Sequence, residues 1–146
     1  MKPVIKRAEE MPPPLMVVGE GITVVSDKSE TSDYEIFLHE GPEGSGPPPH
    51  HHGWDETFYV LDGQIEIGSG AEKVTAGPGT LVHAPAGTPH WFRFGKGGGK
   101  MMGITGQKSN ASTLYAELAR QIPSGAVDLE KLGAVAGRNG VSIGGY

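Results

Sequence analysis

The chain has 146 residues, with 12 Lys and Arg against 17 Asp and Glu, so its formal net charge at pH 7 is -5. Nucleic-acid affinity rests on clustered Lys and Arg, and the acidic balance without a basic stripe argues against a nucleic-acid partner. The absence of cysteine excludes disulfides, thiolate catalysis and cysteine-ligated zinc, and it agrees with a reducing cytosol.

The length and the turn residues predict one domain built mainly of short strands. A chain of this size buries a single hydrophobic core. Its 24 glycines and 12 prolines are spread between apolar runs, which is typical of a turn-rich fold. Residues 1–20 lack the continuous apolar segment of a signal peptide, and no run reaches membrane-spanning length. We therefore expect a cytoplasmic protein that has no membrane partner.

Taken in chain order, the sequence predicts an N-terminal arm over residues 1–20 with one short strand, followed by several strands. Two β-rich stretches come first, "GITVVSD" and "DYEIFLHE". The stretch "ETFYVLDGQIEIGSG" predicts a hairpin around Asp62-Gly63, a dipeptide favoured in type I′ turns. "GTLVHAPAGTPHWFRF" and "KMMGITG" supply further strands, and "GKGGGK" between them predicts a mobile hairpin tip. This spacing favours an antiparallel sandwich or barrel over β-α-β units.

The C-terminal segment changes to a helical pattern. "STLYAELARQI" and "DLEKLGAVAG" each place three apolar residues at helical spacing, and Asp128 is suited to cap the second helix. We expect two short amphipathic helices packed on the outside of the β-structure. Their predicted apolar faces are Leu114, Leu118 and Ile122 in the first helix, and Leu129, Leu132 and Val135 in the second.

The run "HHHGWDE" predicts a metal site. Side chains alternate along a strand, so His50 and His52 project to one face and His51 to the other. Glu56 shares the parity of His52, and His90 follows a Pro-Gly corner from which a returning strand can lie beside the first. Three imidazoles and a carboxylate suit one divalent transition metal ion, namely Fe, Mn, Ni, Zn, Co or Cu. Four protein ligands leave positions open on an octahedral ion, which is typical of a working site.

Two separated runs resemble the two motifs of the cupin superfamily. The first spans residues 44–63 and reads Gly, five residues, His50, one residue, His52, three residues, Glu56, six residues, Gly. The second spans residues 79–90 and reads Gly, five residues, Pro, one residue, Gly, two residues, His. The resemblance implies an all-β double-stranded β-helix, or jelly roll, with His50, His52, Glu56 and His90 holding the metal. We place this barrel at residues 21–108 and a helical extension at 109–146.

One position departs from the family pattern. The second motif often ends in Asn, whereas this chain has Phe94, in phase with His90 and Phe92. This departure predicts a more apolar cavity. The residues that we expect to line the substrate pocket are Phe58, Phe92, Phe94 and Met101.

The histidine run and its surroundings resemble the quercetin-dioxygenase-like branch of cupins. This implies a metal-dependent oxygenase that acts on a hydroxylated aromatic or enediol-like small molecule, with Glu56 as the catalytic proton acceptor. A metal-dependent isomerase or lyase of a sugar or keto acid, and a non-catalytic binding protein, remain as alternatives. We expect His51 and His83 to point away from the metal, leave His39 unassigned, and expect a homodimer because residues 1–25 offer spare strand material.

Overall fold

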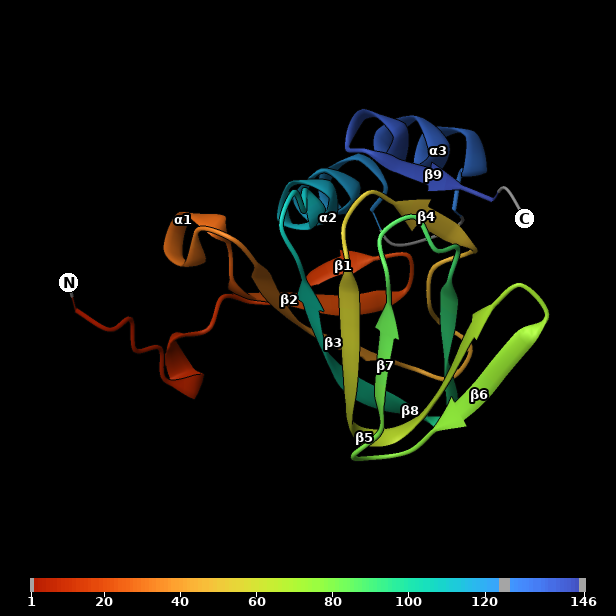
Figure 1. Ribbon diagram of the computed structural model, residues 1–146, viewed down its shortest axis with the longest axis horizontal. Helices are drawn as coiled ribbons and strands as arrows, with labels where there is room; N and C mark the ends of the chain where they lie inside the picture. Colours follow the sequence, from red (N-terminus) through yellow and green to blue (C-terminus); the bar gives the residue numbers. More distant parts are fainter. Residues whose placement is uncertain (1, 124–126, 145–146) are drawn as a thin grey trace.

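The computed structural model describes residues 2–123 and 127–144, and its described part contains nine strands and three α-helices (Figure 1). The elements in chain order are the 3₁₀ helix Ala8–Glu10, β1 (Leu15–Val17), β2 (Glu20–Ser26), α1 (Lys28–Thr31), β3 (Glu35–Gly41), β4 (His50–His52), β5 (Glu56–Ser69), β6 (Glu72–Ala76), β7 (Leu81–Ala84), β8 (Trp91–Thr105), α2 (Ala111–Gln121), α3 (Leu129–Arg138) and β9 (Val141–Ile143). None of these helices is long and apolar enough to cross a membrane.

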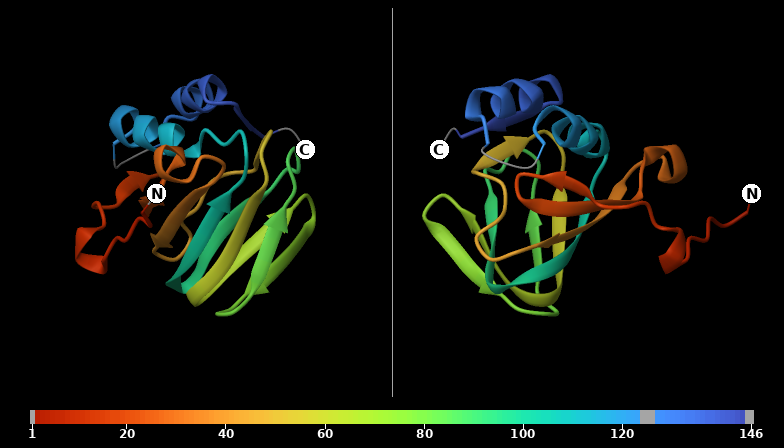
Figure 2. Two further views of the ribbon diagram at one scale, coloured as in Figure 1. Left: turned by 60° about the vertical axis from the view of Figure 1, so that its left-hand side comes forward. Right: turned by 180° about the vertical axis from the view of Figure 1, so that it is seen from behind.

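The strands form an antiparallel jelly roll, which confirms the predicted fold class. The main sheet has the order β1-β2-β3-β8-β5-β6, and β7 also pairs with β5. A separate two-stranded ladder joins β4 to β9. Figure 2 shows the main sheet curving around a common interior, with α2 and α3 over one end.

The two longest strands correct two sequence predictions. Asp62-Gly63 is not a hairpin turn, because β5 runs through it and the chain reverses only between Ser69 and Glu72. "GKGGGK" is not a hairpin tip either, because it lies within β8. The register between β5 and β8 shifts near Gly63, and the backbone there approaches Gly98 so closely that a β-carbon on Gly63 would overlap its carbonyl. Long-range pairing with β8 outweighs the local turn preference, and the glycines form a bulge instead.

The predicted C-terminal helices are confirmed, although they cover the end of the barrel. Asp128 caps α3, since its side chain accepts a hydrogen bond from the backbone N–H of Lys131 at 3.1 Å. Leu129 was predicted on the apolar face, but it is the first residue of α3 and is exposed. The helical residues that are buried in one cluster with Val17, Phe37 and Trp54 are Ala111, Leu114, Leu118, Leu132, Val135 and Ala136. Burial of these side chains against the barrel end stabilises the closed arrangement.

A second buried cluster fills the opposite half of the barrel. Its members are Phe58, Val60, Ile65, Ile67, Ala76, Phe92, Phe94 and Met101. They come from β5, β6 and β8, whose alternate residues face inward. The core therefore has two parts. The predicted metal residues contact both, since His52 stacks on Trp54 of the first cluster and His90 lies near Phe58 of the second.

Candidate metal site and cavity

Backbone hydrogen bonds bring the two predicted motifs together. The amide of His50 donates to the carbonyl of His90 at 3.0 Å, and the amide of His90 donates back at 2.9 Å. The amide of Gly87 also donates to the carbonyl of His52 at 2.7 Å. These bonds place His90 beside β4, even though 40 residues separate it from His50 in the sequence.

The four predicted ligands converge on one point. One atom from each of His50, His52, Glu56 and His90 can be chosen so that all four lie within 4.8 Å of one another. Glu56 Oε1 is 3.3 Å from His52 Nε2 and 3.0 Å from His90 Nε2. All of these residues except His50 are fully buried, and His50 is partly buried. The strand alternation that the sequence predicted is therefore the arrangement that the fold uses.

Each imidazole is held by a backbone carbonyl on its outer nitrogen. Nδ1 of His50 lies 2.9 Å from the carbonyl of Pro48, Nδ1 of His52 lies 3.0 Å from that of Trp54, and Nδ1 of His90 lies 2.9 Å from that of Thr88. A carbonyl only accepts, so Nδ1 carries the proton and Nε2 keeps its lone pair in each neutral ring. Metal-binding histidines are oriented in the same way.

The donor set fits a divalent cation. Three Nε2 lone pairs and an ionised carboxylate face each other across less than 5 Å, and a cation at their centre would satisfy all four at once. Without a cation, a proton shared between Glu56 and one of the two nearest imidazoles reduces the repulsion between the carboxylate and the imidazole lone pairs. Imidazole and carboxylate ligands suit the first-row ions but do not select one of them.

The pKa values of the cluster follow from burial and from the close carboxylate. Burial lowers the pKa of His50 to about 4, and the charge of His90 adds to the effect. Burial alone would raise the pKa of Glu56, but the hydrogen bonds and positive charge of His52 and His90 outweigh it and hold that pKa well below its usual range. Burial alone would lower the pKa of His90, but its hydrogen bond and charge interaction with Glu56 raise it above the ordinary value. Glu56 is thus an anion that can accept metal or proton.

The histidines predicted to point away lie outside this cluster. His83 is exposed and its Nδ1 is 2.9 Å from the hydroxyl of Thr57. His51 pairs with Ser142 of β9, and neither His51 nor His83 belongs to the group of converging ligand atoms. Trp54 stacks on His52 with a ring separation of 4.3 Å and an angle of 11°. The indole therefore supports one face of a metal-cluster imidazole.

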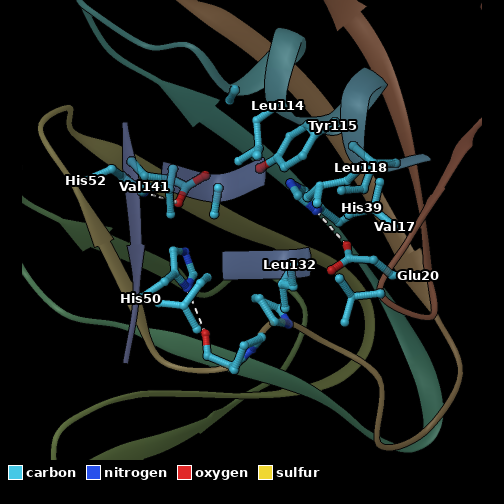
Figure 3. Close-up of a pocket in the computed structure, with 18 of the residues that line it drawn as sticks. Val17, Glu20, His39, His50, His52, Leu114, Tyr115, Leu118, Leu132 and Val141 are labelled. Atoms are coloured by element: carbon cyan, nitrogen blue, oxygen red, sulfur yellow. Dashed lines mark hydrogen bonds and ion pairs between the residues drawn. The ribbon is translucent and has the colours of Figure 1, made fainter. Parts of the chain in front are cut away.

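A narrow cavity connects the cluster to the helices (Figure 3). Its volume is about 60 Å³. This is room for about four to six water molecules. Three of the four cluster residues line it, namely His50, His52 and Glu56, together with apolar side chains from β1, β2, α2, α3 and β9. The C-terminal segment therefore contributes directly to the wall of the candidate site.

The predicted pocket residues lie at different levels of the barrel. Phe92 lines the cavity. Phe58, Phe94 and Met101 are packed below it in the second core cluster, where Phe58 lies edge-on to Phe92 with a ring separation of 5.5 Å. They form the apolar support beneath the cluster.

Three polar residues of the cavity had no assigned role in the sequence analysis. Glu20, His39 and Tyr115 line it together, and Figure 3 shows them on the side opposite His50 and His52. Glu20 and His39 sit on apolar strands at inward-facing positions, since Ile22 and Phe37 two residues away are buried as well. In the sequence, an ionisable residue at an inward-facing strand position was the feature that could have identified Glu20 and His39 as cavity residues. Tyr115 could not be placed without knowing that α2 covers the barrel.

A buried carboxylate positions α2, and with it Tyr115. Glu35 Oε1 accepts hydrogen bonds from the hydroxyl of Ser109 at 3.0 Å and from the amide of Ser112 at 3.1 Å. Negative charge at a helix N-terminus is favourable because the first amides of a helix have no internal partner. Glu35 therefore fastens the start of α2 to β3.

Comparison with known proteins agrees with this architecture. Residues 37–102 match the family described as Cupin domain. Over 82 residues the chain is 32% identical to quercetin 2,3-dioxygenase of Bacillus subtilis (strain 168), a match that covers 56% of this chain and 24% of that protein. The chain therefore spans about a quarter of the length of this curated relative.

Solved structures share the fold at low sequence identity. KdgF from Halomonas sp. aligns with a TM-score of 0.65 at 20% identity, over 73% of this chain and 96% of that one. The polyketide cyclase RemF from Streptomyces resistomycificus aligns with a TM-score of 0.61 at 20% identity, over 73% and 79%. A predicted oxalate decarboxylase from Thermotoga maritima aligns with a TM-score of 0.64 at 17% identity, over 71% and 99%. Both histidine-bearing motifs lie within the segment that matches the Cupin domain family, and the barrel has the fold of these solved structures, which together support membership of the cupin superfamily.

Proposed function

We propose that the chain is a metal-dependent dioxygenase that acts on a small hydroxylated aromatic or enediol-like substrate. The observation that carries the proposal is the convergence of three imidazoles and one carboxylate at the wall of an apolar cavity. The similarity to quercetin 2,3-dioxygenase over 82 residues of the chain supports an oxygen-dependent reaction.

The proposed cofactor is one divalent transition metal ion, drawn from Fe, Mn, Ni, Zn, Co and Cu. His50, His52 and His90 would hold it through Nε2, and Glu56 through a carboxylate oxygen. When bound, such an ion supplies Lewis acidity that lowers the pKa of a coordinated hydroxyl and brings the reactants together.

Glu56 is proposed as the catalytic proton acceptor. Its Oε1 lies within 3.3 Å of two imidazoles that can hold it in place. Glu56 lines the cavity, so a substrate hydroxyl bound beside the cluster can meet this oxygen. Trp54 and Phe92 exclude water from the same region.

The size of the cavity favours a compact substrate. A volume of about 60 Å³ is too small for a three-ring flavonol. A short enediol is closer to the space that α2, α3 and β9 leave, and a single aromatic ring, which needs a cavity of about 150 Å³, requires a small outward shift of these elements. A larger substrate would require these three elements to move away from β4.

Metal analysis followed by oxygen uptake tests the proposal. Protein purified without a tag or chelator is expected to contain about one transition metal ion per chain by elemental analysis, and to consume oxygen with a single-ring diphenol or an enediol. Glu56→Gln keeps the shape of the side chain and is expected to reduce uptake by about a hundredfold or more. His83→Gln, on the exposed strand β7, serves as the matched control and is expected to leave uptake unchanged.

Two other results would favour the alternatives. Product formation without oxygen uptake would indicate an isomerase or lyase that uses the same ion as an electrophile. Metal and ligand binding without any product under air would indicate a non-catalytic binding protein. Either result contradicts the dioxygenase proposal.

The homodimer and the cytoplasmic location stay predictions. Val4 and Ile5 of the N-terminal arm are 64% and 73% exposed, which leaves apolar surface that a second copy can cover. Light scattering coupled to size exclusion would show a mass near twice 15.3 kDa if the chain dimerises.

A further inference from the structure

A buried pair of side chains, His39 and Glu20, lies across the cavity from the metal cluster (Figure 3). His39 Nδ1 is 2.7 Å from Glu20 Oε1, and the two residues are 1% and 2% exposed. They belong to neighbouring strands, His39 to β3 and Glu20 to the start of β2. A pair this close joins the imidazole N–H to the carboxylate and fixes the orientation of the ring.

This pair is hard to explain by stability alone. Its surroundings are apolar, because the neighbouring residues Val17, Ile22 and Phe37 belong to the first buried hydrophobic cluster. Burying an imidazole and a carboxyl group removes two polar groups from water, and well-packed apolar side chains of similar size are often as stabilising or more so. A polar pair in the wall of an apolar cavity therefore points to a polar ligand.

The second ring nitrogen of His39 is the atom of this pair that is left to contact such a ligand. Within the part of the chain that the structure describes, His39 Nε2 is buried and has no hydrogen-bond partner. It faces Gly103 of β8, where an added β-carbon would lie 2.8 Å from it. Any larger residue at this position would therefore crowd Nε2.

Tyr115 completes the polar group. Its ring stands edge-on to that of His39 at 6.0 Å and 88°, and Figure 3 shows its hydroxyl directed from α2 into the cavity. Burial raises the pKa of Tyr115 well above its ordinary value, and the charges of Glu56, Glu20 and Glu35 raise it further. The phenol therefore stays neutral, and the same carboxylates disfavour an anionic ligand group beside it.

We infer that Glu20, His39 and Tyr115 form a second polar subsite, which binds a hydroxyl group of the ligand at the end of the cavity opposite the metal cluster. In this arrangement a small displacement of the His39 ring or of Tyr115 brings Nε2 to accept the hydrogen of this hydroxyl, while its oxygen accepts from Tyr115. The inference rests on the proposed function insofar as the cavity is the substrate site. It narrows the substrate class to compact neutral molecules with hydroxyl groups at two opposite ends of an apolar body, such as para-dihydroxybenzenes.

Calorimetric titration with hydroquinone and phenol tests the subsite. These probes differ by one hydroxyl at the far end of the ring. The protein as purified, and again after chelator treatment, is expected to bind hydroquinone about tenfold more tightly than phenol under nitrogen, because one more buried hydrogen-bonding group is satisfied. The experiment needs neither oxygen nor turnover, so its failure is distinguishable from failure of the dioxygenase proposal.

Three variants separate a binding role from a structural one. His39→Asn can keep the hydrogen bond to Glu20 but has no atom in the place of Nε2. It is expected to bring the ratio of hydroquinone affinity to phenol affinity close to one without weakening phenol binding. Tyr115→Phe is expected to lower the ratio at least about threefold. Tyr59→Phe, on the exposed face of β5, is the matched control and is expected to keep the full ratio.

The inference fails if the wild-type protein shows no preference between the two probes or binds neither. It also fails if both variants are folded by circular dichroism and keep the wild-type ratio. Gly103→Ala supplies an independent check, because its methyl group crowds Nε2 without removing any polar atom. An unchanged ratio in this variant would contradict the position given to the ligand hydroxyl.

Discussion

Acidification of the metal-free protein is expected to lower its stability through His50. The pKa of this residue falls from its ordinary 6.5 to about 4 in the folded state, mainly because of burial. Between these values the unfolded chain binds a proton that the folded chain does not, so stability rises with pH. The contribution of His50 is complete above about pH 6.5 and is lost as the pH falls toward 4.

The magnitude follows from the difference between the two pKa values. A difference of about 2.5 pKa units corresponds to about 3 kcal/mol at 1.36 kcal/mol per unit. At pH 4.5 only part of this free energy is lost, because the pH is still above the folded-state pKa. Partial exposure of His50 to water reduces the loss further. We therefore expect His50 to account for about 2 kcal/mol of lost unfolding free energy between pH 7.5 and 4.5.

Urea unfolding in the presence of a chelator measures this contribution. The unfolding free energy of the wild type and of His50→Gln is compared at pH 7.5 and 4.5, which removes the titration of all groups common to both proteins. The wild type should lose about 2 kcal/mol more than the variant. His83→Gln, an exposed histidine, should behave as the wild type. Equal losses in the wild type and in His50→Gln would refute the claim that burial keeps His50 neutral.

Further predictions concern metal binding and packing. His52→Ala should strip the metal, and the wild type should release it at pH 4.5, because the ligand imidazoles must be neutral; elemental analysis after desalting measures both. Gly46→Ala should destabilise by at least about 2 kcal/mol more than Gly44→Ala in urea unfolding, since both glycines have positive φ but only a β-carbon at Gly46 would overlap the backbone of Phe92. Leu118→Ala should lower the unfolding free energy by about 2–5 kcal/mol by removing a buried contact between α2 and the barrel. Comparable losses for the two glycine variants, or less than about 1 kcal/mol for Leu118→Ala, would contradict the packing described.

The local patterns that proved informative were those with a strict period. His50 and His52 lie on one face because side chains alternate along any strand, and this needs no knowledge of the remaining fold. Leu114 and Leu118 face the core because a helix repeats its faces every three to four residues. The cap at Asp128 depends only on its own turn.

The patterns that misled were those in which a local preference competed with pairing at long range. Asp62-Gly63 favours a tight turn, yet the partner strand β8 continues along β5 on both sides of it, and a bulge satisfies more backbone groups than a turn would. The glycines of "GKGGGK" are the matching half of that bulge. Neither outcome can be read from one strand alone, because register is a property of two.

The amino-acid sequence alone therefore determined the strand content, the two helices and the spacing of the candidate metal ligands, since each depends on a repeat of two to four residues. Only the tertiary structure decided that β9 pairs with β4, that α2 and α3 close the barrel end, and that Glu20, His39 and Tyr115 face the same cavity as Glu56. These neighbours are far apart along the chain. Their proximity results from packing between elements, which the periodicity of a single element does not encode.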